Sequence, residues 1–138
     1  MKPVHFLGVN GVGMSALAHL LLEQKIRVTG EDLSDFNFLE ECGVEKTEEI
    51  PKESIIVYSS AIPLSRVTKL RQAHPSSQIM HRSLMAKILM QQKKGILVAG
   101  SHGKTTTSSL LLWVLKYAGL DPSYAIGGFP NFLKKNGG

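Results

Sequence analysis

Residues 4–22 read VHFLGVNGVGMSALAHLLL, and this stretch decides the fold. A short apolar run at residues 4–9 passes through glycines and gives way to apolar residues spaced by three and four, from Met14 to Leu22. The first pattern predicts a buried strand, and the second predicts a helix that faces a core. A strand, a glycine turn and a helix in this order are typical of an α/β protein with a parallel sheet.

The same alternation continues along the chain. We expect further strands at residues 26–30, 54–59, 78–80 and 96–99, and helices at residues 36–41, 64–73, 84–92 and 104–118. Ser83 is the expected N-cap of the helix at 84–92, and Gly119 is expected to end the last helix. Residues 124–126 are compatible with one more strand, and Trp113 is expected in the core.

Length and composition limit the possibilities. The 138 residues fit one domain, or one domain plus part of another. Hydrophobic residues at 43% and charged residues at 20% are typical of a globular protein. The longest apolar run, residues 110–115, is far shorter than the roughly 20 residues that span a bilayer, so we expect no membrane insertion. The single cysteine, Cys42, excludes a disulfide framework and favours a cytoplasmic location.

Charge is distributed unevenly. Residues 1–53 carry 5 basic and 10 acidic side chains, whereas residues 54–138 carry 11 basic and one acidic side chain. A basic half predicts an anionic partner, either nucleic acid or a phosphorylated small molecule. The basic residues are scattered and do not interleave with aromatic residues, which make up only 7% of the chain. We therefore expect no nucleic-acid partner.

The first glycine loop, Gly8–Gly13, joins a predicted strand to a predicted helix. Glycines let the backbone approach a ligand closely, and the helix start offers free N–H groups to an anion. The spacing is GxxGxG, which differs from the dinucleotide pattern GxGxxG. Asp32 follows the next strand, where an acid can accept hydrogen bonds from a ribose. The alternatives are a packing turn for the glycines and a loop acid or helix cap for Asp32.

The second glycine loop, Gly100–Thr106, reads GSHGKTT before another predicted helix. Such a loop wraps phosphates with backbone N–H groups, a lysine neutralises the terminal charge, and a threonine hydroxyl reaches Mg²⁺. Val98 stands where the strict pattern has its first glycine, so a chance turn remains the alternative. His102 fits a structural role in the turn better than a chemical one.

Other polar residues follow predicted strands. Ser59 and Ser60 end a strand at the edge where α/β proteins bind ligands, and they also fit an ordinary turn. Arg82 could clamp a phosphate with two hydrogen bonds, and it also fits a solvated surface position. His5 and His19 lie in the first strand and helix, and we expect structural roles for both.

Four stretches together resemble the Mur ligases of peptidoglycan synthesis. They are GVNGVGMSALA at 8–18, YSSAI at 58–62, AGSHGKTTT at 99–107 and AIGG at 125–128. The resemblance runs from His5 to Gly128, and the first stretch is most similar to the alanine-adding members. Asn10 stands where those members usually have another glycine.

The resemblance implies a domain organisation and a set of site residues. Residues 1–94 would form a Rossmann-like domain that binds a UDP-sugar, and residues 95–138 would begin a P-loop ATP-binding domain. Lys104 would contact the terminal phosphates of ATP and Thr105 would contact Mg²⁺, both as catalytic groups. The UDP site would comprise Gly11, Val12, Gly13, Met14, Ser15, Asp32, Ser59, Ser60 and Arg82. The ATP site would comprise Gly100, Ser101, His102, Gly103, Lys104, Thr105 and Thr106.

The implied reaction joins L-alanine to the carboxylate of UDP-N-acetylmuramate through an acyl phosphate, at the expense of ATP. Alternatives are a Mur-type ligase for another amino acid, an NAD(P)-binding oxidoreductase, a nucleic-acid-binding module and a small P-loop kinase. Beyond Lys104 the chain has one acid, Asp121, although a P-loop enzyme needs an acid near Mg²⁺.

We therefore expect a fragment that binds the UDP-sugar without ligase turnover, with further domains C-terminal to Gly138. The apolar side of 110–115 would lack its native partners in such a fragment. We expect self-association, fraying beyond about Lys94, or docking of that helix onto the first domain.

Overall fold

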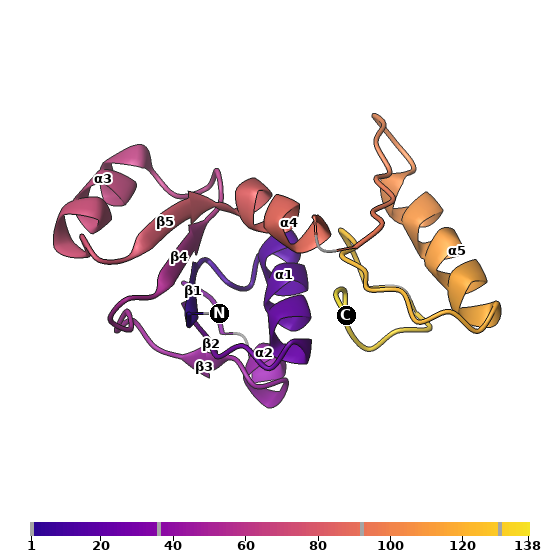
Figure 1. Ribbon diagram of the computed structural model, residues 1–138, viewed down its shortest axis with the longest axis horizontal. Coiled ribbons are helices and arrows are strands. Elements are labelled where there is room, and N and C mark those ends of the chain that lie inside the picture. Colours follow the sequence, from indigo (N-terminus) through magenta and orange to yellow (C-terminus); the bar gives the residue numbers. More distant parts are fainter. Residues whose placement is uncertain (1, 36, 92, 130) are drawn as a thin grey trace.

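The computed structural model describes residues 2–35, 37–91, 93–129 and 131–138. Five parallel strands form one sheet in the order β3-β2-β1-β4-β5 (Figure 1). The strands are β1 (Val4–Leu7), β2 (Val28–Glu31), β3 (Glu45–Lys46), β4 (Ile55–Tyr58) and β5 (Gln78–His81). The helices are α1 (Val12–Glu23), α2 (Asn37–Glu41), α3 (Leu64–Ala73), α4 (Arg82–Met90) and α5 (Lys104–Tyr117).

The central strand β1 pairs with β2 on one side and with β4 on the other, so that Val4 lies opposite both Val28 and Ile55. These three strands are buried on both faces, as strands in a covered parallel sheet are, and β4 is rich in β-branched residues. The predicted α/β class with a parallel sheet is confirmed. The first four predicted strands also form, with ends that differ by at most two residues from those expected.

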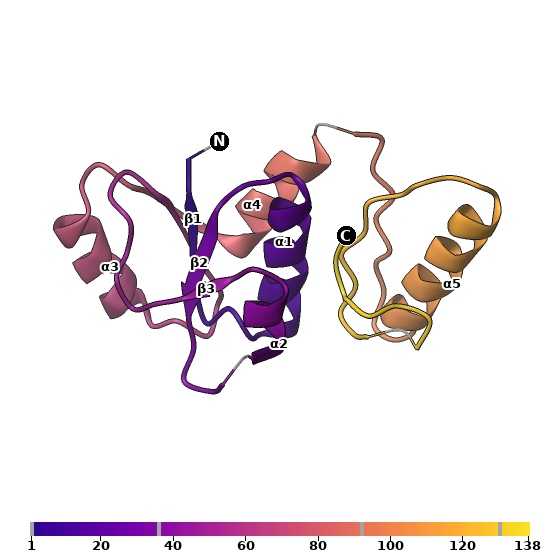
Figure 2. The ribbon, with the colours of Figure 1, turned by 90° about the horizontal axis from the view of Figure 1, so that it is seen from below.

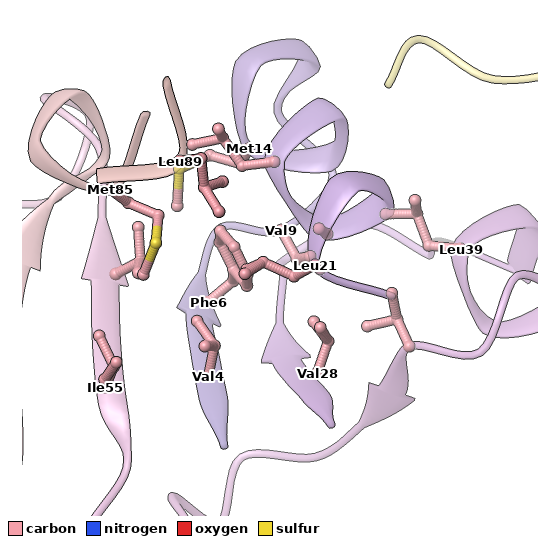
Figure 3. Close-up of a cluster of buried hydrophobic side chains, with 14 of the residues drawn as sticks. Val4, Phe6, Val9, Met14, Leu21, Val28, Leu39, Ile55, Met85 and Leu89 are labelled. Atoms are coloured by element: carbon pink, nitrogen blue, oxygen red, sulfur yellow. The ribbon is translucent and has the colours of Figure 1, made fainter. Parts of the chain in front are cut away.

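The main core lies between the sheet and the two helices α1 and α4 (Figure 3). Because side chains alternate across a strand, Val4 and Phe6 of β1 point to this face. Helix α1 covers them with residues spaced by three and four, which confirms the predicted core-facing helix. The labelled members of this core are Val4, Phe6, Val9, Met14, Leu21, Val28, Leu39, Ile55, Met85 and Leu89.

Helix α3 covers the opposite face of the sheet (Figure 2). His5 is fully buried there, and its Nδ1 lies 2.8 Å from the Thr29 hydroxyl. Burial, with smaller contributions from the nearby charges of His74 and Arg66, lowers the pKa of His5 to about 4. His5 is therefore a neutral part of the sheet packing, which agrees with the structural role expected from the sequence.

Three expectations about local structure are wrong. Residues 96–99 form no strand, because none of the strands in the described part of the chain pairs with them, and Leu97 is 79% exposed. Helix α4 begins at Arg82 and is capped by His81, two residues before the expected cap Ser83. Trp113 is 51% exposed and stacks on Tyr117 instead of lying in the core. The expected ends at Phe36 and Gln92 lie outside the described residues.

Helix α5 stands apart from the N-terminal lobe, which we define as residues 2–91 (Figure 2). The C-terminal tail, residues 131–138, runs back between them and pairs antiparallel with residues 124–126. A cavity of about 390 Å³ separates α5 from α1 and α4, with Leu112 and Leu115 on one side and Leu17 and Leu89 on the other. Among the described residues, no helix is long and apolar enough to cross a membrane.

The C-terminal tail contacts the N-terminal lobe through the fully buried Asn136. Its Nδ2 donates hydrogen bonds to the Val12 carbonyl at 2.7 Å and to the Ser15 hydroxyl at 3.0 Å. Gly137 lies so close to α1 that a Cβ there would be 2.1 Å from the Ala16 carbonyl oxygen. The tail is thus fastened to the first turns of α1.

Candidate functional site

The strand order places a topological switch point at the carboxyl ends of β1 and β4. The connections from these neighbouring strands lead to helices on opposite faces of the sheet, α1 and α3 (Figure 2). Open α/β sheets bind ligands at such a point. The first glycine loop follows β1, Ser59 and Ser60 follow β4, and Arg82 follows β5. The structure therefore brings most of the predicted UDP-site residues to one edge of the sheet.

The first glycine loop presents an open helix start. Gly8 has φ of +76°, a conformation that favours glycine, and it turns the chain out of β1. Gly11 is the N-cap of α1 and provides no side-chain cap, and the first turn contains no acidic residue. The positive end of the helix dipole is therefore not compensated by the helix itself, and it is suited to an anion.

Arg82 lies directly against this helix start. A Cβ built at Gly13 would be 2.0 Å from Nη1 of Arg82 and 3.2 Å from its Cζ, so the guanidinium occupies the space that the missing side chain leaves. Among the described residues Arg82 forms no salt bridge. A guanidinium and a helix N-terminus converge on one point, which is the chemistry that binds a phosphate group.

Asp32 braces the first glycine loop. Its Oδ2 accepts a hydrogen bond from the Asn10 backbone N–H at 2.9 Å, and its Oδ1 accepts from the Ser34 backbone N–H at 3.1 Å and from the Ser34 hydroxyl at 2.9 Å. Partial burial acts to raise the pKa of Asp32, but these hydrogen bonds outweigh it and lower the pKa below its usual value. Asp32 is thus an ionised acid that links the loop after β2 to the first glycine loop, and its contact with a ribose stays a prediction.

Asn10 adds a second link between the same two loops. Its Nδ2 donates to the Ser34 hydroxyl at 2.9 Å and to the Asp35 carbonyl at 3.4 Å. The neighbouring acid Glu31 points elsewhere and pairs with Arg66 of α3. The residue that departs from the family pattern therefore has a structural explanation, because its amide holds the loop after β2 in place.

Two predicted UDP-site residues have buried side chains and backbone N–H groups that are already bonded within the chain. Met14 and Ser15 are each 2% exposed, Met14 in the main core and Ser15 against Asn136. Their backbone N–H groups both donate to the Gly11 carbonyl. The Gly11 N–H donates to the Gly8 carbonyl at 3.3 Å, so in the described part of the chain the N–H groups of Val12 and Gly13 are those left open at this helix start.

The serines after β4 meet a histidine that sequence reasoning did not assign to the site. The Ser59 hydroxyl accepts a hydrogen bond from the Ala61 N–H at 3.4 Å and so belongs to the turn. The Ser60 hydroxyl lies 3.4 Å from Nε2 of His81. The only sequence signal for His81 was its position before Arg82 at a strand end.

The second glycine loop forms the start of α5. Gly103 is its N-cap and has φ of +77°, and no atom lies within 4 Å of where its Cβ would be. Nζ of Lys104 folds over the loop and donates to the carbonyls of Gly100 at 2.6 Å and Ser101 at 3.0 Å. An uncapped helix start, open space at a glycine and a lysine over the loop fit the phosphates of a nucleotide.

Thr105 lies beside the glycine pair at 127–128. A Cβ at Gly127 would be 3.7 Å from the Thr105 hydroxyl oxygen, and one at Gly128 would be 3.0 Å from its methyl carbon. The sequence therefore places small residues where they leave the Thr105 side chain room. Among the described residues, no cluster of three His, Cys, Asp or Glu could hold a metal ion. The open geometry of this loop thus fits phosphate groups, and Thr105 stays the residue predicted to contact Mg²⁺.

Curated relatives are similar over nearly the whole chain. The bifunctional enzyme MurC/Ddl of Chlamydia pneumoniae is 41% identical over 132 residues, which cover 90% of this chain and 16% of the relative. The UDP-N-acetylmuramate–L-alanine ligase of Bifidobacterium longum subsp. infantis is 41% identical over 133 residues, which cover 91% of this chain and 26% of the relative. That of Carboxydothermus hydrogenoformans is 38% identical over 137 residues, covering 93% and 30%. The chain thus spans less than a third of the length of these relatives.

Solved structures have the same fold. The UDP-N-acetylmuramate-alanine ligase MurC of Thermotoga maritima superposes with a TM-score of 0.85 at 22% identity, covering 99% of this chain and 36% of that one. A murein peptide ligase of Psychrobacter arcticus superposes with a TM-score of 0.84 at 27% identity, covering 99% of this chain and 33% of that one. Residues 3–94 match the profile described as Mur ligase family, catalytic domain. The chain therefore belongs to the Mur ligase family.

Proposed function

We propose that this chain binds UDP-N-acetylmuramate at the first glycine loop, and that it contributes this site to the ATP-dependent addition of L-alanine. The observation that carries the proposal is the guanidinium of Arg82 against Gly13, at the start of α1 and at the switch point of the sheet. L-alanine is favoured over another amino acid because curated relatives of 38–41% identity are named for that reaction. Family membership favours a ligase over an NAD(P)-dependent oxidoreductase.

In the proposed reaction the muramoyl carboxylate is phosphorylated by ATP, and the amine of L-alanine then displaces phosphate to form an amide. Arg82 and the N–H groups at the start of α1 bind the diphosphate of the UDP-sugar. Gly100–Thr106 hold the phosphates of ATP, with Lys104 neutralising their charge and Thr105 offering its hydroxyl to Mg²⁺. These residues orient the two substrates and compensate charge, which is most of what a protein does in phosphoryl transfer.

The proposed organisation assigns residues 1–94 to the UDP-sugar domain and residues 95–138 to the opening of an ATP-binding domain. The amino-acid site and the acid that completes the Mg²⁺ site belong, in this proposal, to further domains of the ligase. The 138-residue chain by itself should bind the UDP-sugar and should not turn over. Its substrates, a UDP-sugar and ATP, assign the protein to the cytoplasm.

Calorimetric titration of the chain with UDP-N-acetylmuramate tests the proposal. We expect saturable binding with one site, and roughly tenfold to 100-fold weaker binding by Arg82→Ala, because a charge-assisted bidentate contact is lost. Lys104→Ala is the matched control, since it removes a lysine from the other loop and should leave this affinity unchanged.

Absence of binding by a chain shown to be folded by circular dichroism would overturn the proposed site. Equal losses in Arg82→Ala and Lys104→Ala would point to a nonspecific attraction of anions to the basic half of the chain. ATP titration of the same three proteins should show the reverse pattern, with the loss confined to Lys104→Ala.

A further inference from the structure

His81 contacts both sides of the candidate diphosphate site. It is the last residue of β5 and the N-cap of α4, and its ring is half-buried. The ring packs edge-on against Tyr58 at 5.5 Å between centroids, which fixes its plane. One ring nitrogen faces the start of α4, and the other faces the end of β4.

The hydrogen bonds of His81 assign its tautomer. Nδ1 lies 3.3 Å from the backbone nitrogen of Ser83 and 2.8 Å from the Ser83 hydroxyl. A backbone N–H can only donate, so Nδ1 must be the acceptor, and the proton of the neutral ring is on Nε2. That Nε2–H points to the Ser60 hydroxyl oxygen at 3.4 Å. Ser60 therefore accepts from His81 and keeps its own proton for another acceptor.

These contacts bear on Arg82 as well. Arg82 is the first residue of α4, immediately after the cap, and its guanidinium lies against Gly13. The direction in which Arg82 leaves the backbone depends on how α4 starts, and the imidazole of His81 fixes that start. A single ring thus holds a hydroxyl donor on one strand end and a guanidinium on the next.

We propose that His81, neutral and protonated on Nε2, is a positioning residue of the diphosphate site, which orients the Ser60 hydroxyl and the Arg82 guanidinium toward one anion. This inference rests on the proposed function and adds to it. His81 itself does not touch the ligand, so its substitution acts only through the two residues that it holds.

Two substitutions separate the two roles. His81→Asn retains an acceptor at the position of Nδ1 and so keeps the cap of α4, but it cannot reach Ser60. His81→Leu removes both contacts. We expect UDP-N-acetylmuramate to bind about tenfold more weakly to His81→Leu, and His81→Asn to recover part of the loss. The thermal midpoint should fall further in His81→Leu than in His81→Asn, because both variants lose the ring contact with Tyr58 and only His81→Leu also loses the cap.

Ser60→Ala combined with His81→Asn tests the remaining link. If His81 acts through Ser60, the double variant binds UDP-N-acetylmuramate no more weakly than the weaker single variant. Fully additive losses, wild-type affinity in both His81 variants, or complete recovery by His81→Asn would each overturn the inference. Failure of the wild-type chain to bind UDP-N-acetylmuramate would instead overturn the proposed function itself.

Discussion

At Gly13 a missing side chain makes room for a charged one. Because Gly13 has no Cβ, Nη1 of Arg82 can lie where it does, 2.0 Å from the position that a Cβ would take. The glycine has no positive φ, so its backbone could carry any residue. Its role is therefore close approach to a guanidinium, and this role makes a specific prediction.

We predict that Gly13→Ala separates stability from binding. Alanine favours a helix over glycine by about 0.5–1 kcal/mol, and the atom it meets is the movable end of Arg82, so the thermal midpoint should stay equal or rise. The displaced guanidinium should bind UDP-N-acetylmuramate roughly tenfold more weakly in a titration. In an Arg82→Ala background the same substitution should change the affinity little, and a further large loss there would contradict this explanation.

His5 provides a prediction about pH. Its pKa is lowered to about 4 in the folded chain from 6.5, so the unfolded chain binds more protons between these values. The contribution of neutral His5 to the free energy of unfolding should therefore be fully present above pH 6.5, and it should be lost as the pH decreases toward 4. The loss from this residue reaches up to about 3 kcal/mol.

Urea unfolding at pH 7, 5.5 and 4.5 measures this dependence, with His5→Gln as the control. Glutamine can still hydrogen-bond Thr29 but does not titrate, so its stability should decline less than that of the wild type. Carboxylate titration is common to both proteins and cancels in the comparison. A wild-type minus variant difference that is the same at all three pH values would contradict the prediction.

At the scale of elements, the spacing of apolar residues predicted those helices and strands whose formation depends on residues close together in the sequence. Helix α1 and strand β4 follow from apolar spacing, and both glycine loops were located by their residues. Strand β3 was missed because its two residues, Glu45 and Lys46, are exposed and carry no alternating pattern. The cap by His81 depends on a ring nitrogen meeting the Ser83 N–H, and no helix-capping preference predicts that.

Burial was harder to predict than secondary structure. The apolar residues of α5 predict a buried face, yet Leu112 is the buried member of that helix in the described chain. Hydrophobicity indicates that a residue favours a covered surface, but it does not specify what covers it. The same reasoning explains why residues 96–99 read as a strand and form none, since a strand exists only with a partner.

We predict from this difference in packing that α5 opens more easily than α1. Seven residues of α1 are buried, whereas one residue of α5 is. Local opening free energy depends on buried apolar contacts, so amides of α5 should exchange with deuterium at least about tenfold faster than those of α1. Hydrogen exchange measured by mass spectrometry on peptides from the two helices checks this. Equal protection of both helices would show that α5 is covered in solution.

At the scale of the whole molecule, the N-terminal lobe holds its own core. Every residue of the main hydrophobic cluster lies between Val4 and Leu89, and all five strands of the sheet lie before Arg82. The rest of the chain contacts this lobe through few groups, of which Asn136 forms the buried hydrogen bonds. The N-terminal lobe should therefore be able to fold without the rest of the chain attached to it.

We predict that a chain of residues 1–94 folds cooperatively and still binds UDP-N-acetylmuramate, because the core and the candidate site both lie within it. Loss of Asn136 removes one hydrogen bond from the Val12 carbonyl and one from the Ser15 hydroxyl, which still bond each other, and the two lost bonds should cost about 1–3 kcal/mol in the free energy of unfolding. Asn136→Ala in the full chain should reproduce most of that cost in urea unfolding. A truncated chain that unfolds without a sigmoidal transition would show that the tail is required for the lobe, and the domain boundary proposed after residue 94 would then be wrong.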